Sequence, residues 1–255
     1  MDRKLIAFDV DGTLISYKNE TYIPSQTIAA IEKLKEKGHI ITLATGRSFL
    51  AARPIMNQLG IHHAVLHNGA QIVLNNESFY EKKIGKRTSL IITKALLNTS
   101  LCVFAFDGEN VFANNASEES KKYIIKETGI NDIIKQLCDH SKSLFSINLY
   151  GESSRIFELL SSIKSIVIKK NQFEISAKGI SKSNGIKRLA KQLHISKNNI
   201  IAVGDGLNDI DMIKMAGIGI AVGNACQELK NVANMITDDI EFGGILKAFE
   251  ELKLI

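Results

Sequence analysis

Hydrophobic and polar positions along this 255-residue chain form blocks that predict short buried strands alternating with amphipathic helices. Short apolar runs bounded by turn residues are typical of buried parallel strands. In the first third of the chain, such runs cover residues 5–8, 39–44 and 64–67. One predicted helix begins at a capping Ser25 and ends at Gly38, and another covers residues 48–59 with an interruption at Pro54. This β-α-β-α-β order predicts a parallel sheet.

The pattern changes in the middle of the chain. The pairs Asn75-Asn76 and Asp107-Gly108 each separate two strand patterns, which predicts two β-hairpins. Two helices are expected at residues 118–128 and 154–163, and further strands at residues 144–150, 166–169 and 173–176. Hairpins mixed with helices favour an α+β domain with an antiparallel sheet.

The parallel pattern returns near Gly179. Predicted strands at residues 200–203, 218–222 and 235–237 are accompanied by predicted helices at residues 183–193, 210–216 and 244–252. We therefore expect an α/β protein in which residues 1–82 and 181–255 form a doubly wound core. An inserted α+β domain, residues 83–180, divides this core.

Composition and charge narrow the possible partners. The net charge of +5 favours acidic ligands, yet basic residues occur at most in pairs, so a nucleic-acid partner is not expected. The three cysteines lie far apart and form no C-x-x-C pair, which fits a reducing cytosol and argues against a cysteine metal site. No apolar run has the length of a membrane span or of a signal-peptide core, so we expect a cytoplasmic protein without a membrane partner.

Candidate chemistry begins where the first predicted strand ends. Asp9 and Asp11 follow the apolar run, and Gly12 permits a tight turn after them. Two carboxylates at one strand end repel each other unless a cation lies between them. The natural partner of such a pair is a hard cation that takes oxygen ligands, most often Mg²⁺. The alternative is an ordinary strand followed by an Asp-Gly turn.

Three later segments carry residue types that complement these two carboxylates. They are Thr45-Gly46-Arg47 after the second strand, Lys182 at a helix start, and the group Asp205, Asn208 and Asp209 after the strand at residues 200–203. Ligands of open α/β sheets bind beyond the carboxyl ends of the strands. Taken singly, each residue has a structural explanation as a turn or surface residue. Their joint occurrence at predicted element boundaries favours a site for magnesium and phosphate.

The same segments resemble the four motifs of the haloacid dehalogenase (HAD) superfamily of phosphatases. Asp9-Val-Asp11-Gly-Thr-Leu14 resembles motif one, Thr45-Gly46-Arg47 motif two, Lys182 motif three, and Gly204-Asp205-Gly206-Leu-Asn208-Asp209 motif four. The insertion between motifs two and three resembles a type C2 cap, and Asn68-Gly69-Ala70 is similar to the Cof-like branch. The resemblance covers nearly the whole chain and implies the Rossmann-like HAD core with a cap domain that governs substrate specificity.

The resemblance also implies a role for each matched residue. Asp9 would be the nucleophile that forms an aspartyl phosphate, and Asp11 the general acid and base. Mg²⁺ would bind Asp9, the backbone carbonyl of Asp11, and Asp205, with Asp209 acting through water or orienting these ligands. Phosphoryl oxygens would contact Thr45, the Gly46 amide, Lys182 and Asn208, while Arg47 would contact either the phosphate or the cap.

These roles predict a magnesium-dependent phosphatase acting on a small phosphorylated metabolite. Sugar phosphates, flavin mononucleotide, pyridoxal phosphate and similar phosphomonoesters are all compatible substrates. One alternative is a phosphotransferase or phosphomutase on the same fold. The other is a non-enzymatic phospho-receiver-like domain, which the hundred-residue insertion argues against.

Overall fold

The computed structural model describes residues 2–16, 22–97, 99–108, 110–128, 134–137, 142–150, 165–169 and 172–255. The predicted helix at residues 154–163 lies outside these ranges. The chain divides into two compact units. The first contains Met1–Gly46, Pro54–Tyr80 and Ser181–Ile255, and the second contains Arg47–Arg53 and Glu81–Ile180.

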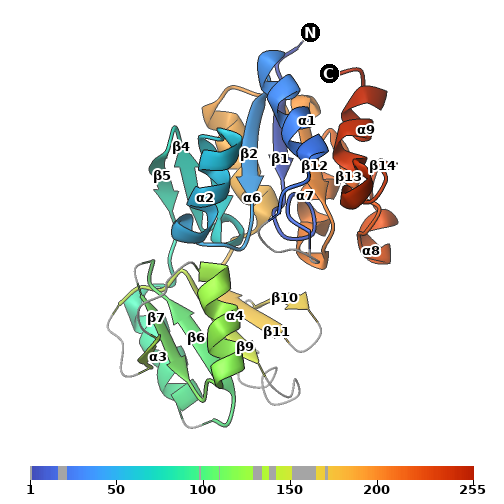
Figure 1. The fold of residues 1–255 in the computed structure, drawn as a ribbon. Coiled ribbons are helices and arrows are strands. Elements are labelled where there is room, and N and C mark those ends of the chain that lie inside the picture. Colours follow the sequence, from blue (N-terminus) through green and yellow to red (C-terminus); the bar gives the residue numbers. More distant parts are fainter. Residues whose placement is uncertain are drawn as a thin grey trace. The chain divides into compact units, whose positions relative to one another are not determined.

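The described part of the first unit is built on an eight-stranded sheet with the order β14-β13-β12-β1-β2-β3-β4-β5 (Figure 1). The strands are β1 (Leu5–Phe8), β2 (Ile40–Ala44), β3 (His63–Leu66), β4 (Gln71–Leu74), β5 (Glu77–Glu81), β12 (Ile200–Gly204), β13 (Ile218–Ala221) and β14 (Met235–Ile236). The pairs from β14 to β3 are parallel, and β4 runs antiparallel to β3. The predicted parallel core is therefore confirmed.

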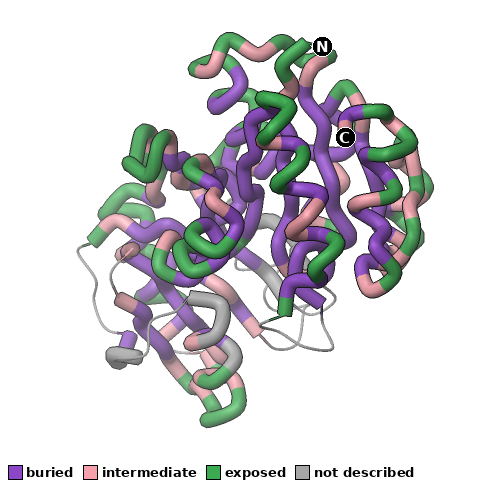
Figure 2. The backbone as a smooth tube through the Cα atoms, turned by 45° about the horizontal axis from the view of Figure 1, so that its top comes forward, coloured by how far each residue is buried: buried purple, intermediate pink, exposed green. Residues whose placement is uncertain are grey.

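Helices cover both faces of this sheet (Figure 1). They are α1 (Ser25–Glu36), α2 (Phe49–Leu59), α6 (Lys182–Gln192), α7 (Ile210–Met215), α8 (Gln227–Lys230) and α9 (Gly244–Glu251). Helix α1 packs against α9, whereas α6 packs against α7, β3 and β4. Every residue of β1, β2 and β12 is buried, and in Figure 2 the exposed positions lie mainly on helices and connections. Both faces of the sheet are thus covered, as an apolar parallel sheet requires.

Two local predictions differ from the structure. Ser25 is the first residue of α1 and not its N-cap, a position that Pro24 occupies without a side-chain hydrogen bond. Pro54 lies inside α2 and does not interrupt it. A proline removes one helical hydrogen bond. Buried apolar residues on both sides of Pro54 compensate, and these are Ala51, Ala52, Ile55, Met56 and Leu59.

The second unit contains a six-stranded sheet in its described residues, with the order β10-β11-β9-β6-β7-β8. The strands are β6 (Cys102–Phe106), β7 (Val111–Asn114), β8 (Ile134–Gln136), β9 (Ser146–Tyr150), β10 (Ser165–Lys169) and β11 (Gln172–Ser176). All neighbours are antiparallel except β7 and β8, which are parallel. The helices in the described residues of this unit are α3 (Lys86–Leu97) and α4 (Glu118–Thr128). The α+β prediction holds, although α3 was not predicted.

Alternating residues of β6 divide the core of the second unit into two apolar clusters. Val103 and Ala105 belong to one cluster together with Ile92 of α3. Phe104 and Phe106 belong to the other together with Ile124 of α4. Because successive side chains of a strand point to opposite faces, both faces of this sheet are apolar and each is packed by a helix.

Strand register in the first unit brings three connections to one edge. Phe8, the last residue of β1, lies level with Leu43 of β2 and Val203 of β12. The residues that follow these three strands therefore emerge side by side at their carboxyl ends, where ligands of open α/β sheets bind. Across the described residues of both units, none of the helices combines the length and apolar character needed to span a membrane.

Candidate active site

Asp9 continues the line of β1 into the connection that follows it. Its backbone N–H donates to the Val203 carbonyl at 3.0 Å, and the residue is only 6% exposed. Gly12 then takes a left-handed conformation, with φ of 84°, and its N–H donates to the Ile15 carbonyl. Glycine adopts this conformation without steric cost. The turn therefore forms because of Gly12, and it leaves Asp11 partly exposed beside the buried Asp9.

Asp209 organises the loop that follows β12. Its Oδ2 accepts hydrogen bonds from the backbone N–H groups of Asp205 and Gly206, both at 3.0 Å. A Cβ atom at Gly204 would lie 2.7 Å from this same oxygen, so the close approach requires glycine. Asp209 is fully buried, and its carboxylate satisfies two backbone donors of this loop.

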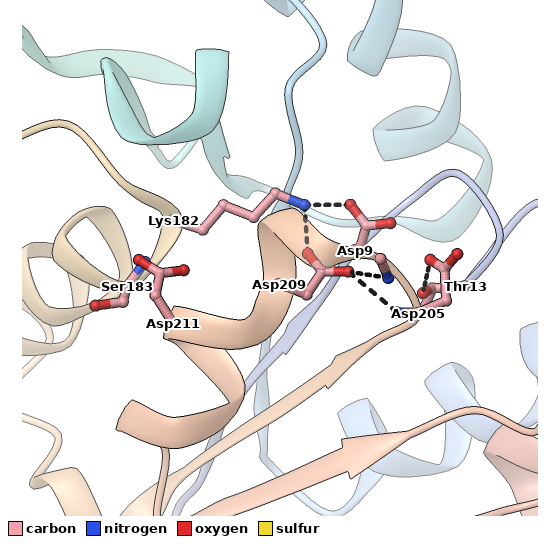
Figure 3. Close-up of polar contacts among 8 residues, drawn as sticks. Asp9, Thr13, Lys182, Ser183, Asp205, Asp209 and Asp211 are labelled. Atoms are coloured by element: carbon pink, nitrogen blue, oxygen red, sulfur yellow. Dashed lines mark hydrogen bonds and ion pairs between the residues drawn. The ribbon is translucent and has the colours of Figure 1, made fainter. Parts of the chain in front are cut away.

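Lys182 is the first residue of α6, and its side chain contacts both the connection after β1 and the loop after β12. Ser181 caps the helix by accepting from the Asn184 N–H at 3.2 Å, as an N-cap serine does. The Lys182 ammonium lies 2.5 Å from Oδ1 of Asp9 and 2.6 Å from Oδ1 of Asp209 (Figure 3). It is 1% exposed, which excludes the alternative that it is a surface lysine.

The site contains more acidic groups than basic ones. Burial raises the pKa of Asp9, and the neighbouring Asp209, Asp205 and Asp11 raise it further against the opposing effect of Lys182. For Lys182, burial alone would lower the pKa, but Asp209 and Asp9 outweigh it and raise the pKa well above its ordinary value. Lys182 is therefore a permanent cation at neutral pH, and negative charge still exceeds positive charge. Such a cluster stabilises an additional cation.

The acidic groups also have the geometry of a metal site. One carboxylate oxygen from each of Asp9, Asp205 and Asp209 lies within 4.8 Å of the others. Hard oxygen donors of this kind fit Mg²⁺. Because Asp209 gives one oxygen to Lys182 and the other to backbone N–H groups, its carboxylate is already engaged. Asp9 and Asp205 are therefore the better candidates for direct ligands.

The second predicted motif lies after the neighbouring strand β2. Thr45 is 1% exposed, its N–H donates to the Val65 carbonyl, and its carbonyl accepts from the Asn68 N–H at 3.0 Å. A Cβ atom at Gly46 would lie 3.3 Å from the Asn68 side chain. Thr45 and Gly46 thus lie at the same edge of the sheet as Asp9.

Asn208 and Arg47 are the remaining predicted site residues, and neither belongs to the contacts described so far. Asn208 is partly exposed in the short 3₁₀ helix Leu207–Asp209, next to the acidic cluster in the chain. Arg47 is buried and belongs to the second unit. The structure therefore brings Asp9, Lys182 and Asp209 into direct contact, with Asp205 in the same cluster.

Two further residues, which the sequence analysis gave no role, contact the cluster or the loop beside it. The Thr13 hydroxyl donates to Oδ1 of Asp205 at 2.9 Å. The Asn224 side-chain amide donates to the Gly12 carbonyl at 2.6 Å. A signal was available for Asn224, because it is a polar residue just after a buried strand, as Asp9 and Asp205 are.

Comparison with known proteins agrees with this architecture. Residues 6–249 match the model of the haloacid dehalogenase-like hydrolases, so the chain belongs to this family. It is 29% identical to YcsE of Bacillus subtilis, a 5-amino-6-(5-phospho-D-ribitylamino)uracil phosphatase, over 97% of this chain and 95% of YcsE.

Two solved structures are similar along nearly their whole length. The sugar phosphatase BT4131, of HAD subclass IIB, superposes with a TM-score of 0.87 at 27% identity, covering 99% of this chain and 100% of that one. BT1666 from Bacteroides thetaiotaomicron, described among phosphatases of this superfamily, gives a TM-score of 0.84 at 26% identity, covering 99% and 96%. The chain is accordingly an enzyme, a Cof-like phosphatase of the HAD superfamily. This result rules out the non-enzymatic receiver-like alternative.

Proposed function

We propose that this enzyme is a magnesium-dependent phosphatase that hydrolyses small phosphomonoesters through an aspartyl phosphate on Asp9. The observation that carries the proposal is the position of the Asp9 carboxylate. It lies at a strand end, in contact with the buried ammonium of Lys182 and beside the acidic groups of Asp205 and Asp209. A carboxylate held between a fixed cation and a cation site is placed to attack an anionic phosphoryl group.

In this proposal, Asp9 is the nucleophile and Asp11 transfers protons. An oxygen of Asp9 attacks phosphorus, and the bond from phosphorus to the leaving oxygen breaks. Asp11 donates a proton to that oxygen and later removes one from the water that hydrolyses the aspartyl phosphate. Asp11 is partly exposed, in keeping with proton exchange with substrate and water.

Lys182 is proposed to bind the phosphoryl group as well as the carboxylates. An ammonium carries three N–H donors, and Asp9 and Asp209 account for two of them. The third donor would bind a phosphoryl oxygen, together with Thr45, the Gly46 amide and Asn208. This binding positions the phosphoryl group and stabilises charge, which are the main catalytic contributions in phosphoryl transfer.

Mg²⁺ would be held by Asp9, the backbone carbonyl of Asp11, and Asp205. Asp209 would orient these ligands. When bound, Mg²⁺ supplies positive charge that offsets the carboxylates and neutralises negative charge developing on the phosphoryl oxygens. Asp209 suits the orienting role because its oxygens already bind Lys182 and two backbone N–H groups. Thr13 likewise orients Asp205 through its hydroxyl group.

The proposed substrate class is a small phosphorylated metabolite, such as a sugar phosphate, flavin mononucleotide or pyridoxal phosphate. The activities of YcsE, on a phosphorylated ribitylamino compound, and of BT4131, a sugar phosphatase, favour a polyol or sugar phosphate. The residues argued above bind only the phosphate and metal that all such substrates share. Residues 83–180 are therefore proposed to act as the cap domain that selects the leaving group, and Arg47 is proposed to contact the substrate.

The proposal is tested by measuring phosphate release from a metabolite panel, with Mg²⁺ present and no added acceptor. An Asp9→Asn preparation serves as the control for contaminating phosphatases. Release of phosphate by the wild-type protein alone supports the proposal. Transfer that occurs only when a sugar acceptor is supplied would contradict hydrolysis and indicate a phosphotransferase.

A further inference from the structure

The segment of residues 222–226, directly after β13, connects the two acidic loops of the site. The Val222 N–H donates to the Gly204 carbonyl at 3.2 Å, and the Cys226 N–H donates to the Asp205 carbonyl at 2.9 Å. Between them, the Asn224 side chain donates from Nδ2 to the Gly12 carbonyl at 2.6 Å. One short segment is therefore hydrogen-bonded both to the loop after β1 and to the loop after β12.

Asn224 is held at both ends of its side-chain amide. While Nδ2 donates to Gly12, Oδ1 accepts from the Ile240 N–H at 3.3 Å. An amide combines a donor and an acceptor, so it can connect a carbonyl on one side with an N–H on the other. Gly12 and Ile240 are separated by more than 200 positions in the chain, and this side chain connects them directly.

The segment that carries Asn224 is itself fixed to its surroundings. The Gly223 N–H donates to the Asp238 carbonyl at 3.0 Å, and its carbonyl accepts from Nζ of Lys230 at 2.5 Å. A Cβ atom at Gly223 would lie 2.3 Å from the Asp239 backbone nitrogen, so backbone packs tightly against backbone here. The backbone that carries Asn224 is therefore fixed by its own contacts. For this reason the hydrogen bond to Gly12 acts mainly to restrain the loop after β1.

The position of the Gly12 carbonyl affects the conformation of the loop after β1. Gly12 lies between Asp11 and Thr13, and it has the left-handed φ of 84° on which the turn depends. Thr13 in turn donates its hydroxyl to Asp205. Fixing the Gly12 carbonyl therefore restrains the peptide between Gly12 and Thr13, and with it the distance between the two acidic loops.

We propose that Asn224 is a positioning residue for the divalent-cation site, although it does not touch the cation. It would hold the Asp9–Asp11 loop in register with Asp205, so that the oxygen ligands are arranged before the cation binds. This inference depends on the proposed function, because it concerns the cation site of that reaction. Partners that orient metal ligands typically alter metal affinity by about 10–100-fold when they are mutated.

Asn234 provides a matched control. Its Oδ1 accepts from the Gly219 N–H at 2.7 Å, so it also joins a side-chain amide to a backbone group. Gly219 lies near the start of β13, away from the carboxyl edge where the acidic loops emerge. Asn234→Ala should therefore lose a comparable hydrogen bond without changing the spacing of the acidic loops.

The experiment compares wild-type protein, Asn224→Ala and Asn234→Ala. Direct titration calorimetry with Mg²⁺ gives the dissociation constant, and 4-nitrophenyl phosphate hydrolysis over a range of Mg²⁺ concentrations gives kcat at saturation. We expect the Mg²⁺ dissociation constant of Asn224→Ala to rise about 10–100-fold. Saturating Mg²⁺ should restore most of its kcat. Asn234→Ala should bind Mg²⁺ within about twofold of wild type, since that bond lies apart from the ligands.

Each other outcome has a defined meaning. An unchanged Mg²⁺ dissociation constant in folded Asn224→Ala overturns the inference, as does an equal loss in Asn234→Ala. If Asn224→Ala does not fold, Asn224→Ser keeps a small hydrogen-bond donor and is measured in its place, with an intermediate rise expected and no rise contradicting the inference. Absence of Mg²⁺ binding by wild-type protein would overturn the metal site itself, which distinguishes failure of the proposed function from failure of this inference alone.

Discussion

Lys182 and Asp209 form a buried ion pair, with 2.6 Å between Nζ and Oδ1 and side-chain exposures of 1% and 0%. The other oxygen of Asp209 accepts from the backbone of the loop after β12, and Lys182 also contacts Asp9. The Lys182 ammonium therefore joins three elements, which are the start of α6, the loop after β12 and the end of β1. Removing Lys182 would leave carboxylates buried without their compensating charge.

We expect Lys182→Met to destabilise the metal-free protein by about 3–5 kcal/mol, the usual cost of removing one partner from a buried ion pair. Urea unfolding in EDTA measures this change. The matched control is Lys247→Met, whose ion pair with Asp238 is about half exposed, with side-chain exposures of 55% and 56%. This control should change stability by less than about 1 kcal/mol. Equal effects of the two substitutions would contradict a structural role for the buried network.

Asp9→Asn should abolish turnover, because an amide is a poor nucleophile. More than a few per cent of residual activity in a contaminant-free preparation would show that Asp9 is not the nucleophile.

The same Asp9→Asn substitution should increase the stability of the metal-free protein at neutral pH. The environment raises the pKa of Asp9, chiefly through burial and the charge of Asp209, so the ionised form is unfavourable in the fold. We expect the free energy of unfolding at neutral pH to rise, because an asparagine carries no charge for this buried environment to destabilise. A group with a raised pKa loses stability as the pH rises through that pKa. The advantage of the variant should therefore shrink as the pH is lowered. A gap that is constant with pH would disprove this explanation.

Activity should require Mg²⁺, and Ca²⁺ should suppress it. Both ions bind carboxylates, but Ca²⁺ tolerates higher coordination numbers and bidentate ligation. Bidentate binding of Asp9 would occupy the oxygen that has to attack phosphorus. Initial rates of 4-nitrophenyl phosphate hydrolysis in EDTA, Mg²⁺ and Ca²⁺ test this expectation. Full activity in EDTA, or equal rates with the two ions, would contradict the metal-dependent mechanism.

Gly69→Ala should displace the segment that carries Lys182. Gly69 has φ of 103°, and an added Cβ would lie 2.2 Å from the Ser181 backbone carbonyl oxygen. Since backbone cannot yield as a side chain does, we expect a loss of about 2–4 kcal/mol of stability and a clear fall in kcat. Gly38→Ala is the control. Gly38 has a similar φ of 80° with nothing within 4 Å of the added Cβ, so only the backbone cost of the left-handed conformation, about 1–2 kcal/mol, is expected. A mild effect at Gly69 would refute the tight contact.

The inserted residues should determine which substrate is used. Replacing residues 84–178 by a short Gly/Ser linker should remove most of the discrimination between the best metabolite and 4-nitrophenyl phosphate, with the aryl ester losing less activity. The ratio of their kcat/KM values, measured on a core shown to be folded by circular dichroism, decides the question. An unchanged ratio would place specificity in the core.

The sequence alone determined the parallel core and the residues of the candidate site. Apolar runs end abruptly at Phe8 and Val203, so the acidic residues that follow had to lie at strand ends. The hairpin at Asn75-Asn76 was equally predictable, because both residues adopt the left-handed conformation that a tight turn between two strands requires. These features depend on neighbouring residues, and local patterns record them.

Tertiary structure decided the features that depend on contacts between distant segments. Helix α2 continues through Pro54 because buried apolar packing offsets a local breaking signal. The pairing of Lys182 with both Asp9 and Asp209, and the bond from Asn224 to Gly12, join positions 27 to 212 residues apart. Such contacts are set by strand order, register and packing, which bring their partners together only in the folded chain. For this reason the sequence could indicate the candidate residues of the site, but the folded structure was needed to show how they are held.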